Sequence, residues 1–182
     1  MDKVKAARSL IQEALAQSQN PCFTCSFQAE DVVVLHLLLK ERPEIPVLFL
    51  DTGYHFPEVY AYRDELQKRL GFRLVNLTPA LSREEQERLY GKLYETDPGR
   101  CCALRKVEPL FAALEAHDTW FTGLRREQSP TRRNLEPQEE ARLDHCFPLV
   151  LLLLLPGALF GPLALTDHLS EGLPLLRHRL LG

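Results

Sequence analysis

Two adjacent cysteines, Cys101 and Cys102, could bind a metal. They follow a Pro-Gly turn and precede apolar residues at helical spacing, so we expect both thiols near a helix N-terminus, beside Arg100, Arg105 and Lys106. Such a setting lowers the pKa of a thiol and favours the thiolate, the form that binds iron or zinc. Two thiols cannot complete a four-coordinate site, and a pair of buried, inert thiols is the alternative.

The turn that follows at Ser26 could bind an anion. It separates a short apolar strand expected at residues 23–26 from a buried helix expected at residues 31–39. A small-residue turn between a buried strand and a helix N-terminus presents free backbone N–H groups and the positive end of the helix dipole, and α/β proteins hold phosphate or sulfate in this way. An ordinary turn without a ligand is the alternative.

Two further segments place polar residues directly after expected buried strands. Asp51 and Gly53 follow the apolar run at residues 45–50, a position where open α/β sheets bind ligands. Residues 123–133 follow a strand expected at 119–122 and contain four arginines, whose planar donors match phosphate or sulfate oxygens. The alternative for this basic loop is a solvated segment paired with Glu136, Glu139 and Glu140.

The remaining elements predict how these segments are positioned. A helix should begin at Pro57 and stop at Gly71, a strand should follow at residues 72–77, and Ser82 with Glu85 forms a capping box that opens a helix to about Leu93. After a first helix at residues 1–17, strands and helices alternate. This order predicts an α/β fold, a doubly wound parallel sheet with helices on both faces.

Composition narrows the function classes. With 182 residues and 45% hydrophobic content, the chain can form a core without disulfides, and a net charge of −3 gives no global attraction to nucleic acid. Residues 1–17 have the pattern of an amphipathic helix and not of a signal peptide, so we expect a cytoplasmic protein. Five cysteines without a leader indicate reduced thiols, metal or redox chemistry.

Five motifs, in order, resemble those of the adenylyl-sulfate and phosphoadenylyl-sulfate reductases of assimilatory sulfate reduction. They lie within residues 21–133 and are Ser-Phe-Gln-Ala-Glu-Asp (26–31), Leu-Asp-Thr-Gly-Tyr-His-Phe-Pro-Glu (50–58), Tyr-Gly-Lys-Leu (90–93), Asp-Pro-Gly-Arg-Cys-Cys-Ala-Leu-Arg-Lys-Val-Glu-Pro-Leu (97–110) and Thr-Gly-Leu-Arg-Arg-Glu-Gln-Ser-Pro-Thr-Arg (122–132). The resemblance implies an adenine nucleotide alpha-hydrolase-like, Rossmann-like fold. It also implies cysteine biosynthesis as the setting.

The resemblance further implies roles for individual residues. The Ser26 loop, with Phe27 and Gln28, would cradle the phosphosulfate, and Lys106 would lie between cluster and sulfate. Cys101 and Cys102 resemble the first half of the 4Fe-4S site in the branch that uses adenylyl sulfate, which makes this substrate the first choice and the 3′-phosphorylated one the alternative. The adenosine would be lined by Asp51, Thr52 and Gly53, and the ligand surrounded by Arg125, Arg126, Gln128 and Arg132. Thioredoxin is the implied reductant, and a homo-oligomer is possible.

The sequence also departs from the family. The nucleophilic cysteine in Glu-Cys-Gly-X-His and the second cluster pair, a downstream Cys-X-X-Cys, are absent, and Cys146 matches neither motif. Cys22 and Cys25 form a Cys-X-X-Cys, but their spacing in a strand points them to opposite faces, so we expect core residues. We therefore identify no catalytic residue in this chain. Two other functions are alternatives to a reductase. An ATP-using enzyme with a pyrophosphatase loop is one, but it would need paired glycines after Ser26, and a noncatalytic nucleotide binder is the other.

The composition changes after about residue 136. Residues 147–182 contain 15 leucines and no lysine, and residues 147–165 carry no charge over 19 positions. This stretch is long enough to span a membrane, but its three prolines argue against a membrane-spanning helix. We predict a nucleotide-binding domain at residues 1–135 and an atypical tail at 136–182. Because GC-rich codons read out of frame often encode Leu, Pro, Arg and Gly, we interpret the tail as truncated or as read in a shifted frame.

Overall fold

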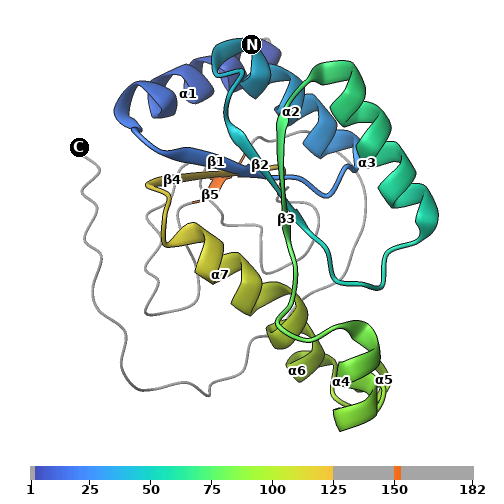
Figure 1. Cartoon of the computed structure of the whole chain (residues 1–182). Helices are drawn as coiled ribbons and strands as arrows, with labels where there is room; N and C mark the ends of the chain where they lie inside the picture. The colour runs from blue at the N-terminus through green and yellow to red at the C-terminus, as the bar shows by residue number, and fades with distance from the viewer. Residues whose placement is uncertain (1–2, 125–149, 153–182) are drawn as a thin grey trace.

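A parallel sheet forms the centre of the protein (Figure 1). The computed structural model describes residues 3–124 and 150–152. In these residues the strand order is β3-β2-β1-β4-β5, and every neighbouring pair is parallel. The strands are β1 (Pro21–Thr24), β2 (Pro46–Leu50), β3 (Arg73–Leu77), β4 (Thr119–Thr122) and β5 (Val150–Leu152).

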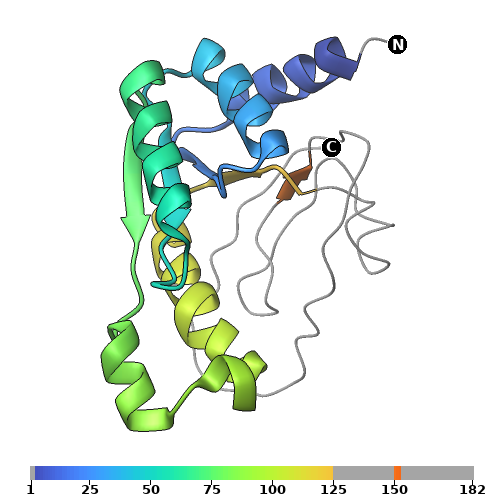
Figure 2. The same ribbon diagram turned by 90° about the vertical axis from the view of Figure 1, so that its right-hand side faces the viewer.

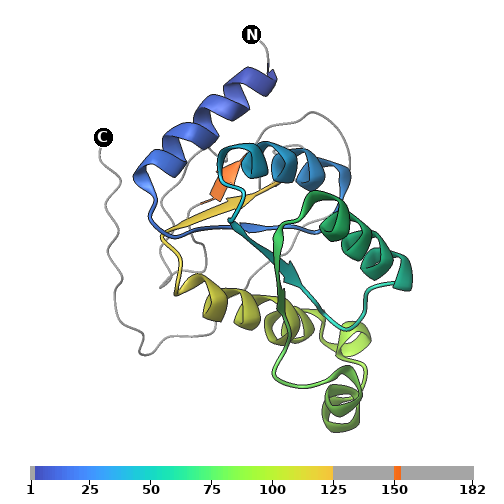
Figure 3. The same cartoon turned by 45° about the horizontal axis from the view of Figure 1, so that its top comes forward.

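Helices cover both faces of this sheet (Figures 1 and 3). One face carries α1 (Lys3–Gln17), α2 (Ala29–Glu41) and α3 (Pro57–Leu70), and the other carries α7 (Glu108–Leu114). Figure 2 shows α4 (Arg83–Tyr90) and α5 (Leu93–Thr96) beyond the edge of the sheet. The helix α6 (Pro98–Cys102) and a π-helical turn, η1 (Ala103–Val107), lead without a break into α7. The predicted α/β architecture is confirmed.

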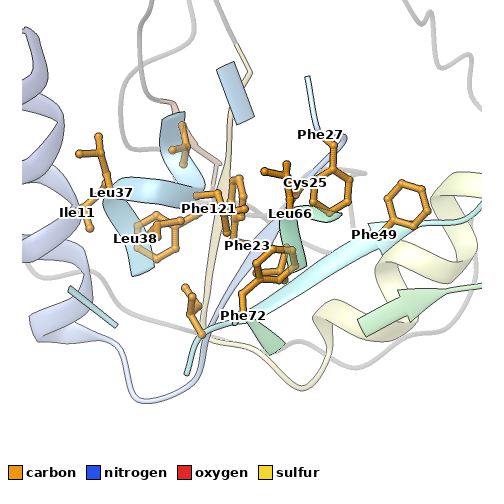
Figure 4. Packing of buried hydrophobic residues seen from close by; sticks show 14 of the residues in the cluster. Ile11, Phe23, Cys25, Phe27, Leu37, Leu38, Phe49, Leu66, Phe72 and Phe121 are labelled. Carbon is orange, nitrogen blue, oxygen red and sulfur yellow. The ribbon is translucent and has the colours of Figure 1, made fainter. Parts of the chain in front are cut away.

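The core has two parts, one on each side of the sheet. The larger packs Ile11, Leu38 and Leu66 from the three helices against Phe23 and Phe121 of the strands (Figure 4). A smaller cluster under the other face contains side chains of β1, β2, β3, β4 and α7, namely Cys22, Leu48, Leu77, Trp120 and Leu114.

The two cysteines of the N-terminal Cys-X-X-Cys belong to different parts of this core. Cys22 lies in the smaller cluster and Cys25 in the larger one, and both are buried. Burial raises the pKa of both thiols far above the ordinary value, so neither is a thiolate. The prediction that they face opposite sides of the sheet as core residues is confirmed.

Local signals located some helix ends and missed others. Ser82 and Glu85 form the predicted capping box, with Ser82 Oγ accepting from Glu85 N at 3.1 Å and Glu85 Oε2 accepting from Ser82 N at 2.9 Å. The prediction that this helix runs to about Leu93 is wrong, because Gly91 adopts φ 70° and ends it after Tyr90.

Only three residues of the segment after residue 124 are described. Val150–Leu152 forms β5, which pairs in parallel with β4. The boundary at residue 135 and the origin of the tail stay predictions, and Cys146 and most of the apolar stretch at 147–165 lie outside the described residues. Within residues 3–124 and 150–152, no helix has the length and apolar character needed to cross a bilayer.

Candidate nucleotide-binding site

Three loops that the sequence singled out leave the same edge of the sheet. The Ser26 turn follows β1, the segment beginning at Asp51 follows β2, and Gly123 follows β4. From β1 the strand order continues through β2 to β3, and the chain then returns to place β4 on the other side of β1. The order therefore reverses between β1 and β4, and in open α/β sheets ligands bind outside the carboxyl ends of the strands at such a reversal.

The Ser26 turn is held by an acidic side chain of the helix that follows it. Asp31 Oδ2 accepts hydrogen bonds from Ser26 N and from Ser26 Oγ, both at 2.6 Å. The Phe27 N–H donates to the Cys25 thiol, and Gln28 N lies 3.5 Å from Ser26 Oγ. The expectation that this turn presents free N–H groups is thus wrong for Ser26 and Phe27, whose donors have acceptors within the turn itself.

Phe27 has an unusual backbone and a core side chain. Its φ of 61° is in the left-handed region, and its buried ring lies 5.6 Å from that of Phe49 and 6.1 Å from that of Phe72. A non-glycine residue in this region is strained, and such strain persists where packing fixes it. The ring therefore anchors the turn to the core, while Ser26 and Gln28 are exposed at the surface.

The loop after β2 is also shaped by its own side chains. Asp51 Oδ1 accepts from Gly53 N at 3.1 Å and from Tyr60 Oη at 2.6 Å. Burial, and then the bond to Asp51, raises the pKa of Tyr60 to about 12. Gly53 has φ 72°, which an L side chain rarely adopts, and its exposed backbone lies beside the buried Thr52.

Arg105 fastens this loop to the helix that carries the cysteine pair. Its side chain is only 3% exposed, and it donates to the Thr52 carbonyl, to Leu81 O at 3.3 Å and to Gln86 Oε1 at 3.0 Å. Gln86 is 1% exposed, and its Nε2 has no hydrogen-bond partner among the described residues. Its guanidinium hydrogen bonds go to two backbone carbonyls and a side-chain amide, and the expectation that Arg105 lies beside the thiols stays a prediction.

Sequence reasoning missed this anchoring role. Arg105 lies in η1, and π-helical turns often occur at functional sites, but nothing in residues 103–107 marks a π-turn. Its three acceptors come from the loop after β2, from Leu81 and from α4, so the role exists only in the folded chain.

A tyrosine connects the β2 loop to α4. Tyr54 Oη donates to Glu87 Oε1 at 2.9 Å, and Arg83 pairs with the same oxygen at 3.1 Å. The Arg105 guanidinium lies 5.3 Å from the Tyr54 ring centroid. Burial, followed by the bond to Glu87, raises the pKa of Tyr54 to about 12, and the charge of Cys101 also raises it, so Cys101 lies near this tyrosine.

The cysteine pair is half-buried, and it lies in α6 rather than before a helix. Burial raises the pKa of Cys102, although the positive charge of Lys106 partly opposes this. The expectation of a lowered thiol pKa is therefore wrong for Cys102, because α6 packs it away from water. Lys106 itself is exposed, and its effect on Cys102 places it near the pair as expected.

The donor set does not complete a cluster site within the described part of the chain. No group of three or more His, Cys, Asp or Glu side chains in residues 3–124 and 150–152 is arranged to hold a metal ion. Cys101 and Cys102 supply two thiols where four are needed for a 4Fe-4S cluster. The four predicted ligand-binding residues of the basic loop, Arg125, Arg126, Gln128 and Arg132, lie outside the described residues.

Comparison with solved structures gives the fold. A phosphoadenylyl-sulfate reductase from Candida auris, in a phosphate complex, aligns over 81% of this chain and 71% of its own, with a TM-score of 0.66 and 20% identity. An FMN adenylyltransferase from Candida glabrata aligns over 85% of this chain and 51% of its own, with a TM-score of 0.61 and 16% identity. The expected adenine nucleotide alpha-hydrolase-like fold is confirmed by both.

Sequence comparison gives the family. The adenosine 5'-phosphosulfate reductase of Streptomyces coelicolor is 47% identical over 114 residues, which cover 62% of this chain and 48% of the relative. The chain spans about half the length of the curated relatives it matches. The family described as "Phosphoadenosine phosphosulfate reductase domain" matches residues 20–151, a range that ends within β5. From this match, and from the motifs placed around the strand ends, we conclude that the chain belongs to the phosphoadenosine phosphosulfate reductase family.

Proposed function

We propose that this chain binds adenylyl sulfate as the nucleotide-binding part of a thioredoxin-dependent adenylyl-sulfate reductase. The observation that carries the proposal is the bond from Arg105 to the Thr52 carbonyl, because it joins the helix of the cysteine pair to the loop expected to line the adenosine. The relatives named adenosine 5'-phosphosulfate reductase support the choice of substrate. Cytoplasmic location, thioredoxin as partner and a homo-oligomer belong to the same proposal.

In the proposed complex, the nucleotide lies across the carboxyl ends of β2, β1 and β4. Asp51, Thr52 and Gly53 line the adenosine, whose contacts include the backbone of the loop that Arg105 fixes. The Ser26 turn, with Gln28, lies beside the phosphosulfate, and the exposed ammonium of Lys106 contributes positive charge toward the sulfate. Arg125, Arg126, Gln128 and Arg132 complete the set by surrounding the anion.

The reaction needs a nucleophilic cysteine thiolate, and no cysteine of this sequence lies in the motif that marks it. In the proposed reaction, a cysteine sulfur attacks the sulfate sulfur, the bond to the phosphate oxygen breaks and AMP leaves. The resulting S-sulfocysteine is reduced by the two thiols of thioredoxin, which become a disulfide as sulfite departs. None of the five cysteines lies in Glu-Cys-Gly-X-His, so we propose that this chain binds the nucleotide and does not complete the transfer by itself.

Cys101 and Cys102 would hold one side of a 4Fe-4S cluster. The described residues do not complete that site, so no step is assigned to it. Anaerobic reconstitution followed by iron and sulfide analysis tests the assignment. Cys101→Ser and Cys102→Ser should each abolish iron incorporation, while Cys146→Ser should leave it unchanged. Equal iron content in all three variants would exclude the pair as ligands.

Calorimetric titration of the full chain with adenylyl sulfate tests the proposed function. Arg125→Ala or Arg132→Ala should each weaken binding by about 1.5–3 kcal/mol, the range for hydrogen bonds to charged groups. Unchanged affinity in both variants would reject the site. Tighter binding of the 3′-phosphorylated nucleotide would favour the alternative substrate. Binding of adenylyl sulfate without sulfite release in the presence of thioredoxin is expected both of this chain and of a noncatalytic relative.

A further inference from the structure

A buried carboxylate lies at the point where the strand order reverses. Asp31 belongs to the first turn of α2 and is 7% exposed. On one side it accepts two hydrogen bonds from Ser26, which follows β1. On the other side it accepts a hydrogen bond from the backbone N–H of Gly123, which follows β4. One side chain therefore joins the two loops that flank the reversal, and we call these contacts the Asp31 latch.

The packing on the β4 side leaves no room for a side chain at position 123 unless the Asp31 carboxylate moves. A Cβ placed on Gly123 would overlap Asp31 Oδ1 and would lie 3.3 Å from Asp31 Cα. The end of β4 thus runs directly against the first turn of α2. Since a methyl group has no room there, the absence of a side chain at position 123 is what lets the N–H reach the carboxylate.

The groups around the carboxylate are neutral donors or negative charges. No lysine or arginine pairs with Asp31 among the described residues, and Glu30 on the same helix adds a repulsive charge. Cys25, at the end of β1, holds its proton. Burial therefore raises the pKa of Asp31, and the three donors offset part of that cost. A buried acidic group with this arrangement is costly to keep for stability alone.

The two segments joined by Asp31 are the ones expected to contact the anionic end of the nucleotide. Ser26 belongs to the proposed phosphosulfate turn, and Gly123 lies two positions before Arg125, the first arginine of the basic loop. We propose that Asp31 is a positioning residue, whose latch fixes the Ser26 turn to the end of β4 so that both present one site to the phosphosulfate. This inference rests on the proposed function for its ligand, although the latch itself does not.

Two substitutions break the latch from opposite ends. Asp31→Asn keeps the shape but leaves a single acceptor oxygen and directs an NH2 group at a donor, so one side of the bridge is lost. Gly123→Ala displaces the carboxylate from the β4 side. Glu30→Gln is the matched control, because it removes the same charge from the neighbouring position and leaves the three donors of Asp31 in place.

Amide hydrogen exchange of the full chain tests the latch without any ligand. Gly123→Ala should increase exchange of the Ser26 amide about tenfold, and Asp31→Asn should do the same for the Gly123 amide, while Glu30→Gln changes neither. The Ser26 result is the more telling, because Ser26 is distant from Gly123 in the sequence. Unchanged protection of both amides would overturn the inference.

Calorimetric titration, below the unfolding temperature of each variant, tests the positioning role. Asp31→Asn and Gly123→Ala should each weaken adenylyl sulfate about tenfold and AMP less, and the double variant should be no weaker than the worse single one. Lost amide protection with unchanged affinity, or an equal loss for AMP, would overturn the positioning role. If the unsubstituted chain binds neither nucleotide, the proposed function fails and the positioning role with it, while the exchange result still decides whether the latch exists.

Discussion

The loop after β1 and the loop after β2 are each anchored by one buried charge, and the two charges differ in sign. Asp31 joins the Ser26 turn to Gly123 through three neutral donors, whereas Arg105 joins the Thr52 loop to Leu81 and Gln86 through three neutral acceptors. Neither has an oppositely charged partner among the described residues. Both buried side chains are therefore hydrogen-bonded to neutral groups, and no opposite charge in the described part of the chain neutralises either of them.

The difference between the anchors lies in how each can respond to burial. A guanidinium keeps its proton in a protein, so Arg105 must be stabilised by its acceptors and by the Tyr54 ring. A carboxylate can take up a proton, and the raised pKa of Asp31 shows that burial pushes it in this direction. The β2 loop should therefore depend strongly on its anchor at every pH, while the β1 turn should tolerate more change and respond to acid.

Removing the cationic anchor should have the largest effect on stability. Arg105→Ala would leave Thr52 O, Leu81 O and Gln86 Oε1 without their donor, and each buried acceptor left unpaired costs about 1–3 kcal/mol. Urea unfolding followed by circular dichroism measures the loss. Arg100→Ala is the control, because Arg100 is exposed on the same helical segment and contacts Tyr90 at 4.3 Å through a cation–π interaction worth about 0.5–1 kcal/mol. Equal effects in the two variants would contradict the anchoring role.

A methyl group at the anionic anchor should have the next largest effect. Gly123→Ala forces the Asp31 carboxylate to move, and overpacking of this kind costs about 1–3 kcal/mol. In an Asp31→Ala background the cost should be smaller, because the carboxylate oxygen that the methyl group meets is gone. Urea unfolding of the two single variants and the double variant measures this coupling, and strictly additive losses would show that Asp31 is not what Gly123 accommodates.

How far the sequence predicts this site depends on the range of each interaction. The Ser82–Glu85 capping box and the start at Pro57 were predictable, because such signals act within one helical turn. The parallel strands followed from continuous apolar runs, and their carboxyl ends located the candidate loops. These features are local, and the structure confirms them.

The two anchors were not predictable, because their partners are distant in the sequence. In the printed sequence Asp31 is an acidic residue at a helix start and Arg105 one of several basic residues near two cysteines. Only the return of the chain to β4 brings Gly123 to Asp31, and only the packing of α4 brings Gln86 to Arg105. The prediction of a lowered pKa for Cys102 was wrong for the same reason. Burial of the thiol raises its pKa by more than the positive charge of Lys106 lowers it.

The cap of α4 should have a smaller effect, and it tests the cationic side of the comparison. Ser82→Ala removes the acceptor of the Glu85 N–H, which costs about 1 kcal/mol, and loosens the helix that holds Gln86 against Arg105. In an Arg105→Ala background the same substitution should cost less if the cap also supports that anchor. Ser9→Ala, at an exposed position inside α1, is the control and should not destabilise. Chemical unfolding distinguishes the two serines.

The pH dependence of the anionic anchor should be the smallest effect and the most specific in sign. Because folding raises the pKa of Asp31 above its ordinary value of 3.8, the folded chain retains this proton to higher pH than the unfolded chain does. The contribution of Asp31 to stability is therefore fully present below that value and is lost as pH rises through the raised pKa. Among the described residues, two titratable groups face its carboxylate: Glu30 from α2, which is charged, and Cys25 from the end of β1, which is still protonated. The unfolding free energy of the unsubstituted chain relative to Asp31→Asn should fall across this acidic range and then level off. Glu41→Gln provides the opposite slope: hydrogen bonds from Gln12 and Arg8 lower the pKa of Glu41, so its contribution is lost as pH falls. A difference for Asp31→Asn that does not change with pH would show that the β1 turn, like the β2 loop, rests on an anchor whose charge does not respond to acid.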